Sequence, residues 1–199
     1  MSAFPFHLSL MPAAPSAGRR RRPRAARGFT LIELAIVVAV VAILLGVGMP
    51  GMSRSIATRA LSAQVAEFIA ALRFARSEAL KRGAVVTVCA ADAASSAPRC
   101  QSHDADWRGG WIVFVDRGAR GAIGADDRML RVQQPLARSG GVPGTRASIR
   151  FNASGISTDA SSHYLFKPSP APAANLPPPV MVCVSKQGRP RVASSGICA

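Results

Sequence analysis

A single carboxylate, Glu33, lies inside a long apolar segment of the sequence. The stretch RGFTLIELAIVV covers residues 27–38, and the 20 residues from Leu34 to Ser53 carry no charge. An acidic side chain at membrane depth costs about 2.5–3.5 kcal/mol, and such residues usually serve a function. A functional role is therefore expected for Glu33; the alternative is a tolerated glutamate whose side chain reaches the lipid headgroups.

A second group of residues that could bind a ligand lies near the other end of the chain, in SKQGRPRV at residues 185–192. Arg189 and Arg191 are two residues apart, so on a strand both side chains leave from one face. Pro190 cannot donate to a strand ladder, which favours an edge strand, and Lys186 falls in the adjoining turn. This pattern predicts an exposed cationic fork suited to bidentate contact with phosphates. The alternative is an edge strand that its charges protect from aggregation.

Enzymatic and metal chemistry find no support in the sequence. The chain has three histidines and lacks the GxSxG, HExxH and P-loop patterns. The acidic and histidine side chains of CQSHDAD match no zinc or EF-hand spacing, so a solvated loop is expected there (His103, Asp104 and Asp106). GADDR, residues 124–128, is interpreted as a turn. We expect neither an enzyme nor a bound cofactor or metal.

The charge distribution predicts how the chain is oriented in a membrane. Residues 1–28 hold six arginines and no acid, whereas residues 29–199 carry 19 basic and 10 acidic side chains, a net +9. As a helix, the uncharged span would be about 30 Å long, the thickness of a bilayer core. Because positive charge stays in the cytoplasm, residues 1–28 are expected there and everything after Ser53 across the membrane. The remaining positive charge favours anionic partners such as nucleic acid or acidic lipid headgroups.

All four cysteines follow the uncharged span (Cys89, Cys100, Cys183 and Cys198). An even number outside the cytoplasm predicts disulfides, with three pairings open. Neighbour pairing, Cys89 with Cys100 and Cys183 with Cys198, closes the shortest loops and is expected.

The apolar residues beyond the span predict a helix followed by strands. Six apolar side chains recur at alternating four- and three-residue spacings, and Gly83 ends the helix (Leu61, Val65, Phe68, Leu72, Ala75 and Ala79). Pro50 should bend or locally unwind this helix. Short β-branched runs then predict strands at 84–90, 111–115, 147–151, 163–167, 180–184 and 189–193. Residues 168–179 contain six prolines and are expected to form an extended loop.

The N-terminus differs from an ordinary secretory signal, which would place a cleavage site after a shorter apolar core. Here the small residue, Gly28, precedes the apolar run, and RGFTLIE resembles the processing site of type IV prepilins and type II secretion pseudopilins. The resemblance implies that a prepilin peptidase cuts between Gly28 and Phe29 and N-methylates Phe29. Glu33 is then the fifth mature residue, and Pro50 the twenty-second, where this family often has a proline. Met11 is an alternative start that would shorten the leader.

Cleavage after Gly28 would create a positive amine on Phe29, four residues before Glu33 and on the same helix face. Glu33 could neutralise this amine or that of an adjacent subunit, which would favour docking in one axial register. The predicted organisation is therefore a leader at 1–28, a transmembrane and assembly helix at 29–53, its periplasmic continuation at 54–82, and a β-rich periplasmic domain at 83–199.

Within the pilins, the chain resembles the FimT/GspH type through ALRFARSEALKRGAVVTVC, WRGGWIVFVD, RMLRV, IRFNASG and GRPRV. This resemblance implies an α+β, type IV pilin-like fold, with a long helix on an antiparallel sheet. FimT proteins implicated in DNA uptake carry a GRxR motif in their DNA-binding site, which Gly188, Arg189 and Arg191 match. The implied partners are the peptidase, other pilins or pseudopilins, the inner membrane and double-stranded DNA. A secretion pseudopilus without DNA binding and a DNA-uptake pilus both stay open.

Overall fold

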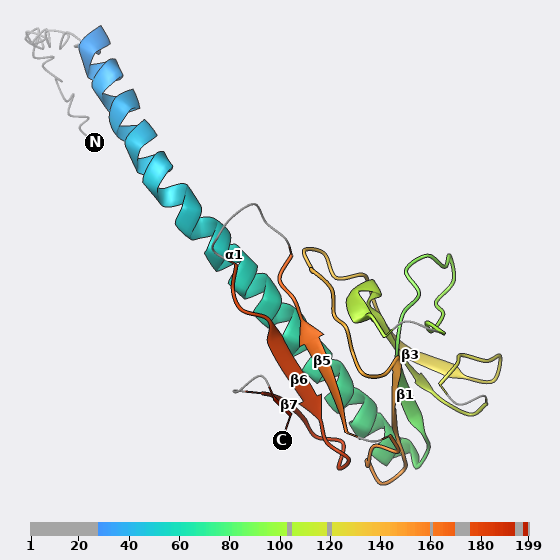
Figure 1. Ribbon diagram of the computed structural model, residues 1–199. Helices are drawn as coiled ribbons and strands as arrows, with labels where there is room; N and C mark the ends of the chain where they lie inside the picture. Colours follow the sequence, from blue (N-terminus) through green and yellow to red (C-terminus); the bar gives the residue numbers. More distant parts are fainter. Residues whose placement is uncertain are drawn as a thin grey trace, which may run out of the picture. The chain divides into compact units, whose positions relative to one another are not determined.

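The computed structural model describes residues 28–102, 105–118, 121–159, 161–169, 176–193 and 197–198, without the side chains of residues 47–53. The chain divides into two compact units, Met1–Ile43 and Leu44–Ala199. One helix, α1 (Leu31–Arg82), contributes to both units, and every strand among the described residues belongs to the second (Figure 1). Among the described residues, no helix has an apolar stretch long enough to cross a membrane.

The first unit contains the start of α1. Thr30 precedes the helix, and its Oγ1 accepts a hydrogen bond from the Glu33 amide at 3.3 Å. Thr30 and Glu33 have the T-x-x-E spacing of a capping box, in which the hydroxyl satisfies an otherwise unpaired amide of the first turn. The helix dipole also favours a carboxylate in this turn. Glu33 therefore has a local role at the helix start that the sequence analysis did not identify.

Of the bend or local unwinding predicted at Pro50, the unwinding is absent, because α1 stays helical through this residue. A proline inside a helix removes one backbone hydrogen bond, and the neighbouring turns still pair. The helix ends at Arg82, and Gly83 follows with a positive φ of 60°. This is the backbone conformation in which glycine commonly terminates a helix, as predicted.

The second unit packs α1 against two antiparallel sheets (Figure 1). The first sheet has the order β3-β2-β1-β4, and the second has the order β5-β6-β7. The strands are β1 (Val86–Ala90), β2 (Trp111–Val115), β3 (Arg128–Gln133), β4 (Ser148–Phe151), β5 (Ser162–Phe166), β6 (Val180–Val184) and β7 (Pro190–Val192), and the short helix η1 (Trp107–Gly109) precedes β2. The predicted α+β fold is correct, but the sequence did not predict that the strands divide between two sheets.

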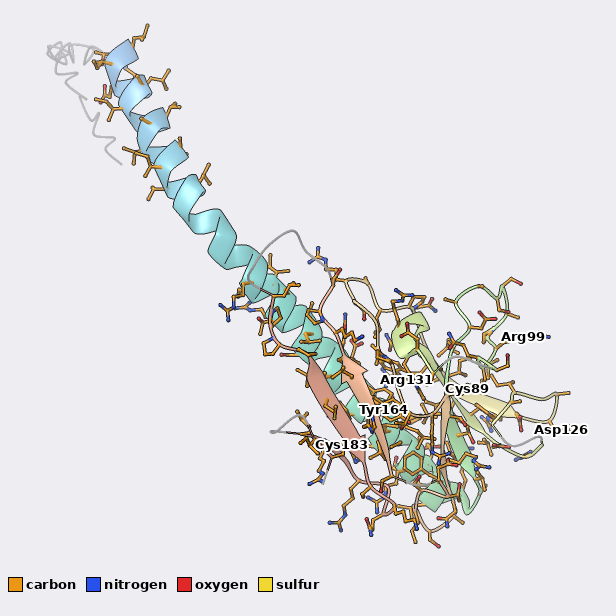
Figure 2. The ribbon with its side chains drawn as sticks, in the orientation of Figure 1. Cys89, Arg99, Asp126, Arg131, Tyr164 and Cys183 are labelled. Carbon is orange, nitrogen blue, oxygen red and sulfur yellow. A yellow bond between two sulfur atoms is a disulfide. The ribbon has the colours of Figure 1, made fainter. Side chains whose placement is uncertain are left out.

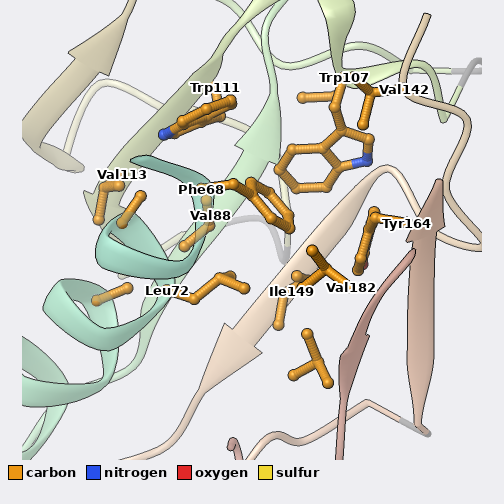
Figure 3. Close-up of a cluster of buried hydrophobic side chains, with 14 of the residues drawn as sticks. Phe68, Leu72, Val88, Trp107, Trp111, Val113, Val142, Ile149, Tyr164 and Val182 are labelled. Atoms are coloured by element: carbon orange, nitrogen blue, oxygen red, sulfur yellow. The ribbon is translucent and has the colours of Figure 1, made fainter. Parts of the chain in front are cut away.

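The core lies where the predicted apolar stripe of α1 meets both sheets (Figure 3). All six stripe residues are buried, as predicted (Leu61, Val65, Phe68, Leu72, Ala75 and Ala79). Phe68 is at the centre: its ring lies 5.1–5.4 Å, between centroids, from four other rings (Trp107, Trp111, Tyr164 and Phe166). Burial raises the pKa of the Tyr164 phenol above its ordinary value, against the effect of a hydrogen bond to Ser162 Oγ.

A smaller apolar cluster covers the opposite face of the first sheet. It consists of Cys89, Ala91, Ile112 and Phe114, with Cys100 and Ile123 packed against it. Because apolar groups cover both faces, β1 and β2 are buried along their whole length. This explains why β2 is a continuous apolar run, and why β1 has a single polar residue, Thr87, whose hydroxyl donates to Asp116 Oδ2 at 2.8 Å.

The first testable consequence concerns Phe68, which is fully buried. Phe68→Ala should lower the free energy of unfolding by about 3–5 kcal/mol, because it leaves a cavity among the aromatic rings. Urea unfolding of the full-length protein in neutral detergent, followed by the fluorescence of Trp107 and Trp111, measures this loss. The same substitution at Phe29, which is 83% exposed, is the matched control and should change stability little. Equal effects of the two substitutions would contradict the central role of Phe68.

Candidate functional site

The predicted cationic segment forms the hairpin that joins β6 to β7. The two strands pair antiparallel, with Cys183 opposite Arg191 and Val184 opposite Pro190. A tight turn connects them, in which the Gly188 amide donates to the Ser185 carbonyl at 2.8 Å. β7 is the last strand of its sheet, as predicted from Pro190, which lacks the amide hydrogen that an inner strand needs.

The hairpin brings together the three predicted cations, and all three are exposed (Lys186, Arg189 and Arg191). Lys186 lies in the turn, Arg189 directly before β7, and Arg191 inside it. The Ser185 amide donates to the Arg189 carbonyl at 3.2 Å, which extends the ladder by one pair beyond the strand. Side chains alternate along an extended segment, so both arginines leave from the face that carries Cys183. We call this the outer face of the second sheet, because Val182 points into the core from the opposite face.

Both disulfides join the neighbouring cysteines that were expected to pair. Cys183 is linked to Cys198, with the Cα atoms 5.7 Å apart, so the C-terminal segment is attached to the middle strand of the sheet (Figure 2). Cys89 is linked to Cys100, with the Cα atoms 5.5 Å apart, beside the smaller apolar cluster. The Cys183–Cys198 disulfide restrains the outer face that carries the arginines.

Two glycines, Gly188 and Gly155, lie in contact and let the hairpin turn approach α1 closely, because neither has a side chain. A Cβ atom added to Gly188 would lie 2.6 Å from the Gly155 carbonyl oxygen, and Gly188 has a φ of 71°. A Cβ atom on Gly155 would lie 3.1 Å from both Arg76 Nε and Leu80 Cγ of α1. The Ser157 amide also donates to the Lys186 carbonyl at 3.0 Å. The turn therefore rests on the 152–157 loop, which in turn rests on α1.

The support beneath this loop includes an ion pair that the sequence analysis missed. Arg150 Nη2 lies 2.8 Å from Asp159 Oδ1, and Asp159 Oδ2 accepts from the Arg150 amide at 3.0 Å. The hydrogen bond to Asp159 raises the pKa of the Arg150 guanidinium, against the effect of partial burial. Nothing in the sequence spacing links these two residues, which lie on β4 and in the loop before β5.

The predicted processing residues lie at the start of α1. Gly28 is exposed and would accept a Cβ atom without contact, and Phe29 is also exposed. Glu33 lies in the first helical turn. The leader, residues 1–27, lies outside the described residues, and of Pro50 only the backbone is described.

The acidic loop after Cys100 has a structural role where it is described. Asp106 Oδ1 accepts from the Arg108 amide at 3.0 Å and from the Val142 amide at 2.8 Å, so this carboxylate caps η1. His103 and Asp104 lie outside the described residues. In the part of the chain that the structure describes, no three acidic, histidine or cysteine side chains are grouped to hold a metal ion.

Comparison with known proteins agrees with this arrangement. Residues 64–188 match the family described as Type II transport protein GspH, and residues 23–49 match the Prokaryotic N-terminal methylation motif. The type IV minor pilin FimU of Pseudomonas aeruginosa (strain PAO1) is similar in its P21 crystal form, with 19% identity and a TM-score of 0.50 over 70% of this chain and 92% of that one. Its P65 form gives 18% identity and a TM-score of 0.48 over 69% and 96%. No curated protein matches the chain.

The fold, a helix packed on antiparallel sheet, is that of a type IV minor pilin. Because one family model covers more than half of its residues, the chain belongs to the GspH family. This confirms the family that the sequence motifs indicated, and it places the chain among pilin and pseudopilin subunits, which assemble into filaments.

The glycine stack generates a second prediction. Gly188→Ala should destabilise the fold by about 1–2 kcal/mol, because alanine is disfavoured at positive φ, and by more where its Cβ meets the Gly155 carbonyl. Gly118→Ala is the matched control: Gly118 has no atom within 4 Å of an added Cβ and no positive φ. Thermal unfolding of both variants tests the difference, and equal melting temperatures would show that the turn does not depend on this contact.

Proposed function

We propose that this chain is a minor filament subunit that binds duplex DNA weakly, and without sequence preference, through the β6–β7 hairpin. One observation carries the DNA-binding part: Lys186, Arg189 and Arg191 are exposed together on a hairpin that a disulfide and two stacked glycines hold in place. The Gly188, Arg189 and Arg191 pattern also matches the GRxR motif of the FimT type.

The chemistry of this hairpin suits phosphates. Arginine presents a planar set of donors that matches phosphate oxygens, and holding the backbone in place reduces the entropy that binding must overcome. The net +9 charge of residues 29–199 would attract a polyanion from a distance. Phosphate contacts carry no sequence information, so the proposed binding is non-specific and sensitive to salt.

A role in protein secretion alone is the second candidate, since the matching family is described as a type II transport protein. In that case the hairpin arginines would protect an exposed sheet edge from pairing with other chains. The two candidates share the fold and the filament, and they differ in whether the outer face contacts DNA.

We further propose that a prepilin peptidase cleaves between Gly28 and Phe29 and methylates the new amine of Phe29. The match to the methylation motif supports this, as does the exposure of both residues directly before α1. The amine of Phe29 would then lie one helical turn from Glu33. Pairing between Glu33 and the amine of an adjacent subunit would select the axial register in the filament.

Residues 29–53 would anchor the subunit in the inner membrane before assembly, with the leader in the cytoplasm and the C-terminal domain in the periplasm. Two features support this topology: the arginines that precede the uncharged span and the exposed apolar side chains at the start of α1 (Phe29, Leu31, Ile32, Leu34, Ile36, Val37, Val38, Val40, Val41, Ile43, Leu44 and Leu45). Exposed apolar surface of this extent needs lipid or protein to cover it. In the filament, the same side chains would pack against other pilins or pseudopilins.

The DNA-binding proposal predicts that removing the hairpin arginines lowers the affinity for DNA. Combining Arg189→Gln with Arg191→Gln should weaken DNA binding and lower the slope of log K against log salt by about 2, because two phosphate contacts are removed. The unaltered protein should lose roughly tenfold in affinity between 50 and 200 mM salt. Gel shifts with full-length protein in neutral detergent measure both effects.

The matched control combines Arg128→Gln with Arg131→Gln, which removes the same charge from exposed positions on β3, in the other sheet. It should bind DNA nearly as well as the unaltered protein. In cells, the hairpin variant should lower transformation and leave exoprotein secretion intact. Loss of secretion with normal transformation would instead support the secretion role.

The assembly proposal predicts that Glu33→Ala is cleaved after Gly28 but incorporated poorly into filaments, because the amine at Phe29 loses its partner. Leader cleavage is measured by the change in mass on a denaturing gel, and incorporation by the amount in sheared filaments. Glu67→Ala, at an exposed position later in α1, is the control and should assemble normally. Normal incorporation of the Glu33 variant would refute the pairing.

A further inference from the structure

Three residues form one row across the outer face of the second sheet. His163 on β5 lies opposite Cys183 on β6, which lies opposite Arg191 on β7. Directly opposed residues of antiparallel strands project to the same face. The row spans two strand spacings, about 10 Å. The next residues in register, Tyr164 and Val182, are buried on the opposite face.

His163 is exposed at the end of this row, and its backbone is fixed from the neighbouring segment. The His163 amide donates to Thr145 Oγ1 at 3.1 Å, and the Thr145 amide donates to the His163 carbonyl at 3.0 Å. On the other side lies Cys183, which the disulfide to Cys198 restrains. The backbone of His163 is therefore fixed on the same face of the sheet as Arg189 and Arg191.

The charged groups on the surrounding elements are mostly cationic. Arg146 follows Thr145, Lys167 follows β5, and Arg191 lies on β7. The acid that precedes β5, Asp159, is paired with Arg150. Among the described residues of these elements, no other carboxylate is present to pair with the imidazole. An anion brought to this face would therefore meet Arg191 at one end of the row and His163 at the other, with the Cys183–Cys198 disulfide between them.

We propose, building on the DNA binding argued above, that the phosphate-contacting surface continues from the hairpin to His163, and that DNA binds more tightly as the pH falls. Histidine is the side chain that ordinarily changes charge between pH 5 and 8. The protonated imidazole adds a cation to the row and contacts a further phosphate, whereas the neutral form does not. DNA binding thus takes up a proton, so affinity rises as the proton concentration rises.

The test measures the anisotropy of a fluorescent duplex with full-length protein in neutral detergent, at about pH 5.5 and about pH 8. The unaltered protein should bind about two- to fivefold more tightly at the lower pH. Its salt slope should become steeper by about 0.9, the value of one added phosphate contact. His163→Asn should bind at the lower pH as the unaltered protein does at the higher pH.

Two further variants complete the experiment. His163→Lys should bind tightly at both pH values, because its charge does not depend on pH in this range. His103→Asn removes the other histidine that follows the proposed cleavage site, and it should keep the pH response of the unaltered protein. Near-ultraviolet circular dichroism checks that each variant keeps the native fold.

An unchanged pH response in His163→Asn would overturn this inference and leave the hairpin function standing. The inference would also be overturned if, at the higher pH, the His163→Lys variant bound DNA no more tightly than the unaltered protein. If the unaltered protein bound no DNA at either pH, the proposed DNA binding itself would be wrong, and this inference would fall with it.

Discussion

The packing of one helix side chain, Phe68, between the two sheets is the constraint on which the rest of the domain depends. Its ring contacts Trp107 and Trp111, beside and within the first sheet, and Tyr164 and Phe166, on β5 of the second (Figure 3). The aromatic rings packed around Phe68 thus come from both sheets and from η1. Edge-to-face and tilted contacts of this kind stabilise a core beyond the area that they bury. The sheets have no strand in common, and the side chains of α1 pack against both of them in one core.

The β6–β7 hairpin, which carries Lys186, Arg189 and Arg191, is positioned by contacts with this core. Val182 and Val184 fix β6 against the helix side of the sheet, and the turn at Gly188 rests on Gly155, which rests on α1. Opposite faces of the same strands therefore serve different purposes: one is buried, and the other presents His163 and Arg191 to solvent. Because interiors are close-packed, a change in the core would displace the outer face.

Much of the fold could be predicted because its signals are local. The apolar stripe from Leu61 to Ala79 reports one helix face, and the β-branched runs report strands, since both patterns depend on nearby residues. The division into two sheets could not be predicted in this way. β4 pairs with β1, far back in the sequence, while β5 begins a new sheet, and such pairings depend on contacts between distant segments. At Pro50 a local rule predicted a bend or a local unwinding, and the helix shows no unwinding there.

The sequence by itself determined the candidate residues: the methylation motif around Gly28 and Glu33, the arginines of the GRPR segment, and the cysteines available to pair. Only the tertiary structure decided what supports and surrounds them. Gly155 beneath Gly188, Asp159 beside Arg150, and His163 in line with Arg191 are each separated along the chain and joined only by folding. The physical reason is that motifs are encoded by neighbours in the chain, whereas surfaces are assembled by long-range packing and strand register.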